Sequence, residues 1–333
     1  MIRYVCKSED ENVLLSSLLP GRLDIYTSTL RKLKVGGGIF LNGEPVHVRR
    51  FVHEGDVVEI DLYKAETPSQ ITPEPWLPEI IYESPGMLAV NKPAMSVVHP
   101  TCFHHTGTIA AGVVNYYNKT GLNSGIHLVN RLDLGTSGLL LFAKYGLVQE
   151  RMKSQAASGE YKKVYIGVID VLDGRNDIVP GFTGTVDAPI ERDRSSIIKR
   201  KVGEGGDPSV TKYTILAADK QTGKALAAFS LLTGRTHQIR VHMSHIGLPL
   251  TGDTMYNPAS DETTEKISSE GPHQLLHHYR ASFTEPLTAE RVTVRCPVPE
   301  NIAGSFPELF CEKSRTLTME AENQLSAGLF PAS

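Results

Sequence analysis

The sequence predicts an α+β protein: a mixed, mainly antiparallel sheet flanked by helices and loops, with a small α/β unit before it. The strand candidates after residue 80 do not alternate regularly with helices, as they would in a doubly wound parallel sheet. Helix candidates there are also fewer than strand candidates. A stretch rich in proline and polar residues sets off the first 66 residues, which have helix and strand patterns of their own.

Residues 1–66 form the predicted small unit. Its expected elements are, in order, an amphipathic helix over 14–19 that ends at Pro20-Gly21, a helix after the capping residues Thr27, Ser28 and Thr29, a strand over 39–41 followed by the turn Asn42-Gly43, and an alternating strand over 57–62.

We expect a linker at 67–80, with Trp76 as a candidate anchor, then a larger domain at 81–312 and a loosely ordered tail at 313–333. The strand candidates of the larger domain are 87–91, 138–144, 162–170, 210–216, 225–231 and 291–296. Its helix candidates are 109–117, 145–157 and 236–246.

Composition excludes several classes of protein. The 333 residues carry a net charge of −3, which argues against a protein that coats nucleic acid nonspecifically but allows local basic surfaces. No apolar run is long enough to span a bilayer, and the N-terminus has acidic residues where a signal peptide has its apolar centre. The four cysteines are far apart and form no C-x-x-C pair, so we expect reduced thiols in a cytoplasmic protein.

The segment from Asn130 to Gly138 places Arg131 and Asp133 two residues apart in a polar stretch before the apolar run 139–143. That run is typical of a buried strand, and a carboxylate on a loop anchored by a rigid strand is well placed for chemistry. A surface ion pair before a core strand explains the same pattern. Both interpretations are open on this segment alone.

A second polar segment, 233–242, reads TGRTHQIRVH. Thr236 can cap a helix whose apolar stripe contains Ile239 and Met243, and Arg240 then lies in its first turns, off that stripe. An arginine held near Asp133 would keep that carboxylate ionised, although the sequence does not show that the two are close.

A third candidate is Tyr165, which alternates with Val164 and Ile166 and so faces the other side of a strand. A tyrosine that faces a pocket can stack on a nucleobase, and a core tyrosine is the plainer alternative. His237, His242 and His245 share one segment, but His237 and His242 fall on different faces of a helix and no cysteine or carboxylate set accompanies them. We therefore expect no metal site.

These segments resemble the RluA/RluD-type pseudouridine synthases. Their motifs are, in this chain, Asn91-Lys92-Pro93 with His99-Pro100, the segment Asn130 to Gly138, Lys163-Val164-Tyr165, the segment GRTHQIRVH at 234–242, Gly247 to Asp253, and Gln274-Leu275-Leu276-His277. Several spaced motifs in the same order are more specific than any one of them, and together they span nearly all of 81–297.

The resemblance implies a pseudouridine synthase fold and an enzyme that isomerises specific uridines in structured RNA, without a cofactor or metal. It implies that Asp133 is the active carboxylate, acting as a nucleophile at ribose C1′ or as a base at C2′. Arg240 would be its ion-pair partner, Tyr165 would stack on the uracil and Leu276 would pack near the base. Arg131 resembles the residue that fills the space left by the flipped nucleotide.

Residues 1–66 are similar to the ribosomal-protein S-four-type RNA-binding module, in which the basic helix faces RNA phosphates. Arg31, Lys32 and Lys34 are the corresponding residues, and plain solvation is the alternative for them. By analogy the partner is large-subunit ribosomal RNA, and the enzyme acts as a monomer with no membrane contact.

Departures from the family pattern at Asn130, Leu134 and Gly135 bear on which RNA is read. Two other functions compete with isomerisation. One is an RNA-binding or ribosome-assembly factor. The other is a glycoside hydrolase, which would need a second carboxylate across the scissile bond from Asp133.

Overall fold

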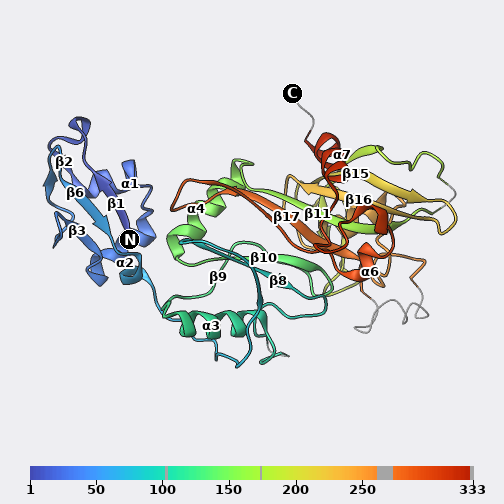
Figure 1. Ribbon diagram of the computed structural model, residues 1–333, viewed down its shortest axis with the longest axis horizontal. Coiled ribbons are helices and arrows are strands. Elements are labelled where there is room, and N and C mark those ends of the chain that lie inside the picture. Colours follow the sequence, from blue (N-terminus) through green and yellow to red (C-terminus); the bar gives the residue numbers. More distant parts are fainter. Residues whose placement is uncertain (102–103, 173–174, 261–272, 331–333) are drawn as a thin grey trace.

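A computed structural model describes all of the chain except residues 102–103, 173–174, 261–272 and 331–333. Cys102 therefore lies outside the described residues. The chain forms a small N-terminal module at one end of the molecule and a larger body built around one extended sheet (Figure 1).

The N-terminal module contains a four-stranded antiparallel sheet in the order β1-β6-β3-β4. Its elements are β1 (Ile2–Val5), β2 (Val13–Leu14), α1 (Leu15–Arg22), α2 (Thr27–Gly36), β3 (Ile39–Leu41), β4 (Glu44–Pro45), β5 (Phe51–Val52) and β6 (Val57–Ile60). Asn42 and Gly43, with φ of 54° and 82°, make the turn between β3 and β4, because the left-handed region that this hairpin needs suits both residues.

Helix α1 continues through Pro20 to Arg22, so the expected end at Pro20-Gly21 is wrong. A proline removes one backbone donor but still accepts helical φ. Burial of Leu15, Leu18 and Leu19 in the core of the module holds the helix in spite of that loss.

The module is fixed to the body by polar contacts at its edge. The Glu66 carboxylate lies 2.7 Å from His127 Nε2 and accepts the Gly146 N–H at 2.8 Å. Thr29, on α2, donates to Glu150 on α4 (Gly146–Ala157). In the linker, the Trp76 ring lies on Gly112, where an added Cβ would come within 2.7 Å of it.

The sheet of the body has ten strands, eight of them in the order β12-β15-β16-β11-β17-β10-β8-β7, with β9 beside β10 and β18 beside β17. They are β7 (Glu79–Glu83), β8 (Met87–Lys92), β9 (His127–Leu128), β10 (Ser137–Ala143), β11 (Lys162–Asp170), β12 (Thr183–Asp187), β15 (Val210–Asp219), β16 (Lys224–Leu231), β17 (Leu276–Thr284) and β18 (Arg291–Arg295). Every pair is antiparallel except β10 with β17, so the predicted mixed, mainly antiparallel sheet is confirmed.

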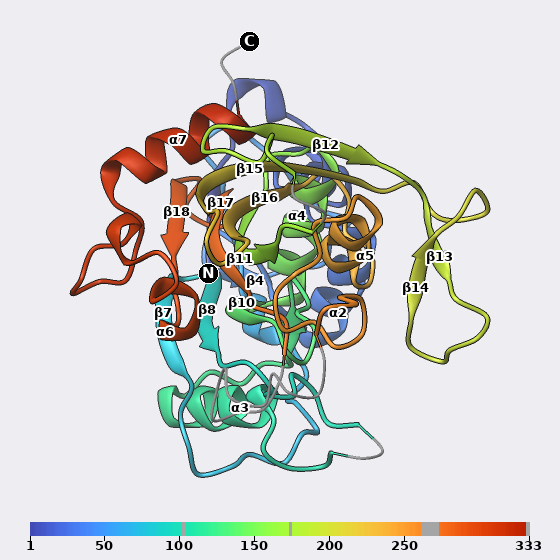
Figure 2. The same ribbon diagram turned by 90° about the vertical axis from the view of Figure 1, so that its right-hand side faces the viewer.

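Helices cover both faces of this sheet. The remaining elements of the body are α3 (Ile109–Thr120), α5 (Gln238–His245), α6 (Glu300–Ala303), α7 (Met319–Leu329) and the hairpin of β13 (Ile190–Arg192) and β14 (Arg200–Val202). Val164 and Ile166 pack with α6 and α7 on one face, whereas Tyr165 packs with Ile239 of α5 on the other. The hairpin projects from the body beside α5 (Figure 2).

The expected loose tail is wrong for residues 313–330, while 331–333 lie outside the described part of the chain. Thr318 caps α7 by accepting the Ala321 N–H, and Ala321, Leu325 and Leu329 are buried against the sheet. Glu322 adds ion pairs to Arg280 and Arg295. Four-residue spacing of the apolar side chains places them on one face of the helix, which is why this segment docks.

No helix within the described ranges is long and apolar enough to cross a membrane.

Candidate active site

Asp133 lies on the loop between β9 and β10, and a buried lysine holds that loop in place. The ammonium group of Lys92, at the end of β8, donates to the carbonyl oxygens of Pro93, Leu134 and Thr136 at 2.8–2.9 Å. A buried ammonium needs such acceptors to replace water. Lys92 therefore ties the part of the loop that follows Asp133 to the rigid sheet.

The residues that depart from the family pattern shape this loop and do not contact the Asp133 carboxylate. Asn130 is buried, its amide donating to the Leu139 carbonyl and accepting the Leu141 N–H. Gly135 packs against Gln274, and an added Cβ would come within 2.6 Å of that side chain. Gly138, at φ 105°, lets β10 approach the backbone of β17.

Arg240, on α5, is held mainly by a carboxylate to which the sequence assigned no role. Its Nε and Nη2 donate to the two oxygens of Asp253 at 2.7 and 2.8 Å, and Asp253 is buried. Its Nη1 lies 3.5 Å from Asp133 Oδ2. Arg240 therefore does contact Asp133, as expected, but at a longer distance than it contacts Asp253. Asp253 is the last residue of the motif Gly247 to Asp253, and this position is the sequence feature that could have marked it as a site residue.

Asp253 is fully engaged, because it also accepts the backbone N–H groups of Met255 and Tyr256 at 3.1 and 3.2 Å. A bidentate arginine–carboxylate pair of this kind fixes the orientation of the guanidinium. Asp133, by contrast, keeps 27% of its side chain exposed and faces the cavity. Asp253 therefore serves to position Arg240 and is not a second free acid.

Tyr165 and Leu276 form an apolar wall beside Asp133. Tyr165 is 6% exposed, and its ring stacks on His278 with centroids 4.6 Å apart. Burial, with the charge of Asp133 as a smaller cause, raises the pKa of Tyr165, so its hydroxyl stays protonated. Burial lowers the pKa of His278 to about 3, so the ring on which Tyr165 rests is neutral.

His237 also enters the site, and its place in the motif at 234–242 was the available signal. Its Nε2 lies 3.9 Å from Asp133 Oδ2, and its Nδ1 lies 2.8 Å from the hydroxyl of Tyr256. The expected helix start is wrong here: α5 begins at Gln238, and His237 precedes it at φ 58°, with no side-chain cap. The sequence pattern does not predict a left-handed backbone conformation at this histidine.

One cavity is lined by the candidate site residues from several of the sequence motifs. Its lining includes Arg131, Asp133, Tyr165, Arg240 and Leu276. It opens into a wider depression of about 490 Å³, which Lys163 and Arg235 also line. Burial lowers the pKa of Lys163, and exposed Arg131 and Arg235 lie at the mouth. The mouth is thus rich in cations, and Asp207 lies 3.7 Å from Arg235 at its edge.

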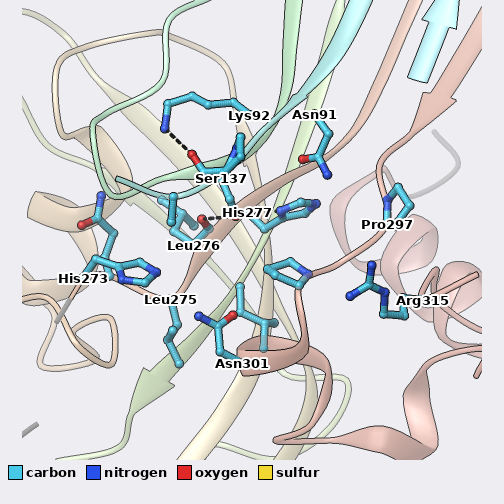
Figure 3. A pocket seen from close by; sticks show the side chains of 15 residues that line it. Asn91, Lys92, Ser137, His273, Leu275, Leu276, His277, Pro297, Asn301 and Arg315 are labelled. Atoms are coloured by element: carbon cyan, nitrogen blue, oxygen red, sulfur yellow. Dashed lines mark hydrogen bonds between the residues drawn. The ribbon is translucent and has the colours of Figure 1, made fainter. Parts of the chain in front are cut away.

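A separate hollow, about 170 Å³ in volume, is lined by His277, Asn301 and Arg315 and not by Asp133. Figure 3 shows its lining side chains. Leu276 lines both hollows. His277 lies 2.8 Å from the Ser137 hydroxyl and tethers the start of β10 to β17.

The structure does not bring the basic helix of the module to this cavity. Arg31, Lys32 and Lys34 are exposed on α2, at the end of the molecule that the module occupies (Figure 1). Lys34 instead borders a groove lined by Gly37, Pro45 and His47. Any RNA contact there is made away from Asp133.

Within the described part of the chain, no group of three histidine, cysteine, aspartate or glutamate side chains is arranged to hold a metal ion. His242, another histidine of the segment 233–242, is buried between the Thr211 hydroxyl and the Ala188 carbonyl. Cys6, Cys296 and Cys311 form no disulfide.

The cavity combines an open carboxylate, a fixed arginine and an aromatic wall. The arginine can donate to a carboxylate or phosphate oxygen, and an aromatic side chain offers a stacking surface for a planar base. The arrangement suits a reaction at a sugar carbon attached to such a base, with the ring enclosed on its apolar sides.

Comparison with known proteins agrees with this geometry. A family model described as RNA pseudouridylate synthase matches residues 86–245. An uncharacterised RNA pseudouridine synthase of Bacillus subtilis is 37% identical over 285 residues, covering 85% of this chain and 95% of that protein. Ribosomal large subunit pseudouridine synthase D of Neisseria meningitidis is 34% identical over 296 residues, covering 87% and 76% respectively.

Among solved structures, human RNA pseudouridylate synthase domain containing 4 is 21% identical and shares the fold, with a TM-score of 0.53 over 69% of this chain and 92% of that one. Sequence likeness over most of the chain and a shared fold agree with the family motifs found around the cavity. This protein therefore belongs to the RluA/RluD-type family of RNA pseudouridine synthases, enzymes that isomerise uridine in RNA.

Proposed function

We propose that the enzyme uses the Asp133 carboxylate, without a cofactor, to isomerise uridines in large-subunit ribosomal RNA. The observation that carries the proposal is the contrast between the two carboxylates beside Arg240. Asp253 accepts two hydrogen bonds from the guanidinium and is buried, whereas Asp133 stands 3.5 Å from it and faces the cavity. A carboxylate that is charged but not fully hydrogen-bonded keeps a lone pair for the substrate.

The reaction needs no redox change and no donated group, because the uracil leaves ribose C1′ through N1 and returns through C5. Asp133 can attack C1′, or it can take the C2′ proton to give a glycal. Both routes begin at the same carboxylate oxygen. The detached uracil must stay in place while it turns, and Tyr165 and Leu276 supply apolar walls for this.

The target uridine must leave its stack, which costs a few kcal/mol. We assign the filling of the vacated position to Arg131, which is exposed and lines the cavity. The flanking backbone would follow the cations beyond it, which include Arg235 and, on the projecting hairpin, Arg192 and Arg200 (Figure 2). Phosphate contacts of this kind set position and affinity rather than sequence.

The remaining partner assignments rest on surface charge and on the named relatives. Arg31, Lys32 and Lys34 form an exposed basic face that could hold a distant part of the same RNA. Large-subunit ribosomal RNA is favoured because relatives named ribosomal large subunit pseudouridine synthase D cover most of the chain. Because the side chains around the cavity come from one chain, we propose a monomer, acting in the cytoplasm where we expect its RNA.

The test is to map pseudouridine in RNA from cells with and without the gene, and from cells that carry Asp133→Asn. We expect specific sites to disappear in the deletion and in the variant. Asp219→Asn, at the last residue of β15, is the matched control and should restore them. A fully active Asp133→Asn enzyme would refute the role of this carboxylate. Sites confined to transfer RNA would refute the ribosomal assignment alone.

The same strains separate isomerisation from an assembly role. If Asp133→Asn restores growth of a deletion strain while the pseudouridines remain absent, RNA binding rather than catalysis is the essential function. If it fails to restore growth although the variant is folded and binds RNA, the isomerisation is what the cell requires.

A further inference from the structure

His237 faces the reacting carboxylate, yet the proposed function gives it no role. It lines the same cavity as Asp133, Tyr165 and Arg240. Its side chain is 13% exposed, and Nε2 is 3.9 Å from Asp133 Oδ2. This separation is too long for a hydrogen bond and leaves Nε2 able to meet a substrate atom.

The imidazole ring is held from behind. Nδ1 lies 2.8 Å from the Tyr256 hydroxyl, and the two rings meet edge to face with centroids 5.6 Å apart. Tyr256 is fixed in turn, because its hydroxyl accepts the Arg200 N–H at 2.8 Å and its ring faces the Arg240 guanidinium. The ring of His237 therefore has one orientation relative to Asp133.

The backbone is constrained as well. His237 has φ 58°, a conformation that costs free energy for a residue with a side chain. The Gln238 side chain fixes the preceding turn by accepting the Arg235 N–H and the Thr233 hydroxyl at 2.9 Å. A costly conformation that surrounding contacts enforce, beside a reactive group, is an indication of function.

The charged groups around His237 are Asp133 on the motif loop, Asp253, Arg240 on α5 and Arg200 on β14, with the Tyr256 hydroxyl behind it. Burial lowers the pKa of His237, Asp133 opposes that shift, and Arg240 reinforces it. The ring is therefore neutral at neutral pH and can accept a proton. Once it does, the nearby Asp133 carboxylate stabilises the imidazolium.

We propose that His237 is the base that removes the proton from C5 of the uracil after the new carbon–carbon bond has formed. The proposal rests on the proposed function. When C5 joins C1′, C5 carries both the sugar and its hydrogen, and C6 is doubly bonded to N1. Nε2 takes the hydrogen as a proton, and the C5–H electrons restore the C5–C6 double bond. The C6–N1 π electrons move to N1, which takes a proton from water, and the imidazolium returns its own to water.

Asp133 acts on the ribose in both routes, whereas the proton to be removed is on uracil C5, and His237 offers a second proton acceptor in the same cavity. The role requires the tautomer in which Nδ1 donates to the Tyr256 oxygen and Nε2 carries the lone pair. Tyr256 is then a positioning residue that holds the imidazole ring through Nδ1 and does not touch the substrate.

The experiment is single-turnover conversion of an RNA whose target uridine carries hydrogen or deuterium at C5. The variants are His237→Gly and His237→Asn, because both residues tolerate positive φ and leave the turn unstrained. His245→Asn, on the exposed end of the same helix, is the matched control. Circular dichroism and RNA affinity establish that each variant is folded and binds.

We expect both His237 variants to lose roughly 10²-fold or more in rate, the usual contribution of one acid–base group, with RNA affinity unchanged. C5 deuterium should slow them further, and imidazole in the buffer should partly restore His237→Gly. The decline of the wild-type rate at acid pH should vanish in these variants. Full activity without His237, or a loss with neither isotope effect nor rescue, would overturn the assignment. If the wild type forms no pseudouridine on any RNA, the proposed function itself fails.

Discussion

Two ion clusters lie on opposite faces of the sheet, and they differ in how completely their charges are satisfied. On the α7 face, the Glu322 carboxylate accepts from Arg280, from Arg295 at 2.7 Å and from the Tyr279 hydroxyl at 2.6 Å. On the α5 face, Arg240 is satisfied by Asp253, but Asp133 has contacts of 3.5 and 3.9 Å and an open side. The closed cluster holds α7 on the sheet, whereas the open one leaves the Asp133 carboxylate facing the cavity.

The largest expected effect comes from Asp133→Asn. The rate should fall by about 10⁴-fold, the upper range for one catalytic group. The free energy of unfolding should change by no more than about 0.5 kcal/mol, because Asp133 makes no close hydrogen bond in the site. Single-turnover kinetics and urea unfolding measure the two. A large loss of stability would mean that Asp133, like Glu322, helps to hold the fold.

Asp253→Ala should damage both properties, because it leaves the Arg240 guanidinium buried without its bidentate partner. We expect about 3 kcal/mol less stability, typical of removing one member of a buried pair, together with a large fall in rate. Urea unfolding and single-turnover rates on the folded fraction report these effects. If stability falls but the rate per folded molecule stays the same, Asp253 does not position Arg240 for catalysis.

Glu322→Gln should give the opposite result to Asp133→Asn. Removing the charge that Arg280 and Arg295 share should lower the free energy of unfolding by about 2 to 3 kcal/mol, while the folded enzyme keeps its rate. Thermal unfolding and a rate measured well below the midpoint decide this. If Glu322→Gln is as stable as the wild type, the cluster on the α7 face is not structural. If the variant is folded but inactive, that cluster is not separate from the active site.

The pH dependence of stability also tests whether Glu322 has a structural role. Burial alone raises the pKa of Glu322, but hydrogen bonds from Arg295 and Tyr279 outweigh it, and the net pKa is lowered. A carboxyl with a lowered pKa contributes stability above its unfolded pKa and loses it as pH falls toward the folded value. The free energy of unfolding should therefore decrease below about pH 4.5, the region of an ordinary glutamate pKa, and less steeply in Glu322→Gln. Equal slopes would contradict the prediction.

The smallest effect on the chemical step is expected from the module. Replacing Arg31, Lys32 and Lys34 by alanine should weaken RNA binding and leave the rate at saturating RNA unchanged. The slope of log affinity against log salt should become shallower by about 0.9 for each phosphate that the variant no longer neutralises. The control replaces Lys119, Lys220 and Lys313, which are exposed elsewhere. Equal salt slopes for both triples would mean that the basic helix is merely solvated.

The sequence determined the local elements and the identity of the motif residues. Apolar runs and capping signals predict the central strands and α3, because periodicity reports which face of an element is buried. Alternation also placed Tyr165 on the face away from Val164, as the structure confirms. The sequence also carries a signal for α7, in the capping residue Thr318 and the spacing of Ala321, Leu325 and Leu329.

Tertiary structure alone decided which charges meet. Arg240 takes Asp253 as its close partner and reaches Asp133, 107 residues earlier, at the longer distance, because the buried loop that ends at Asp253 packs directly against α5. The left-handed conformation of His237 and its contact with Tyr256 likewise depend on segments that only folding brings together. Local patterns encode burial and turns, whereas the choice between two carboxylates depends on distances that no local pattern contains.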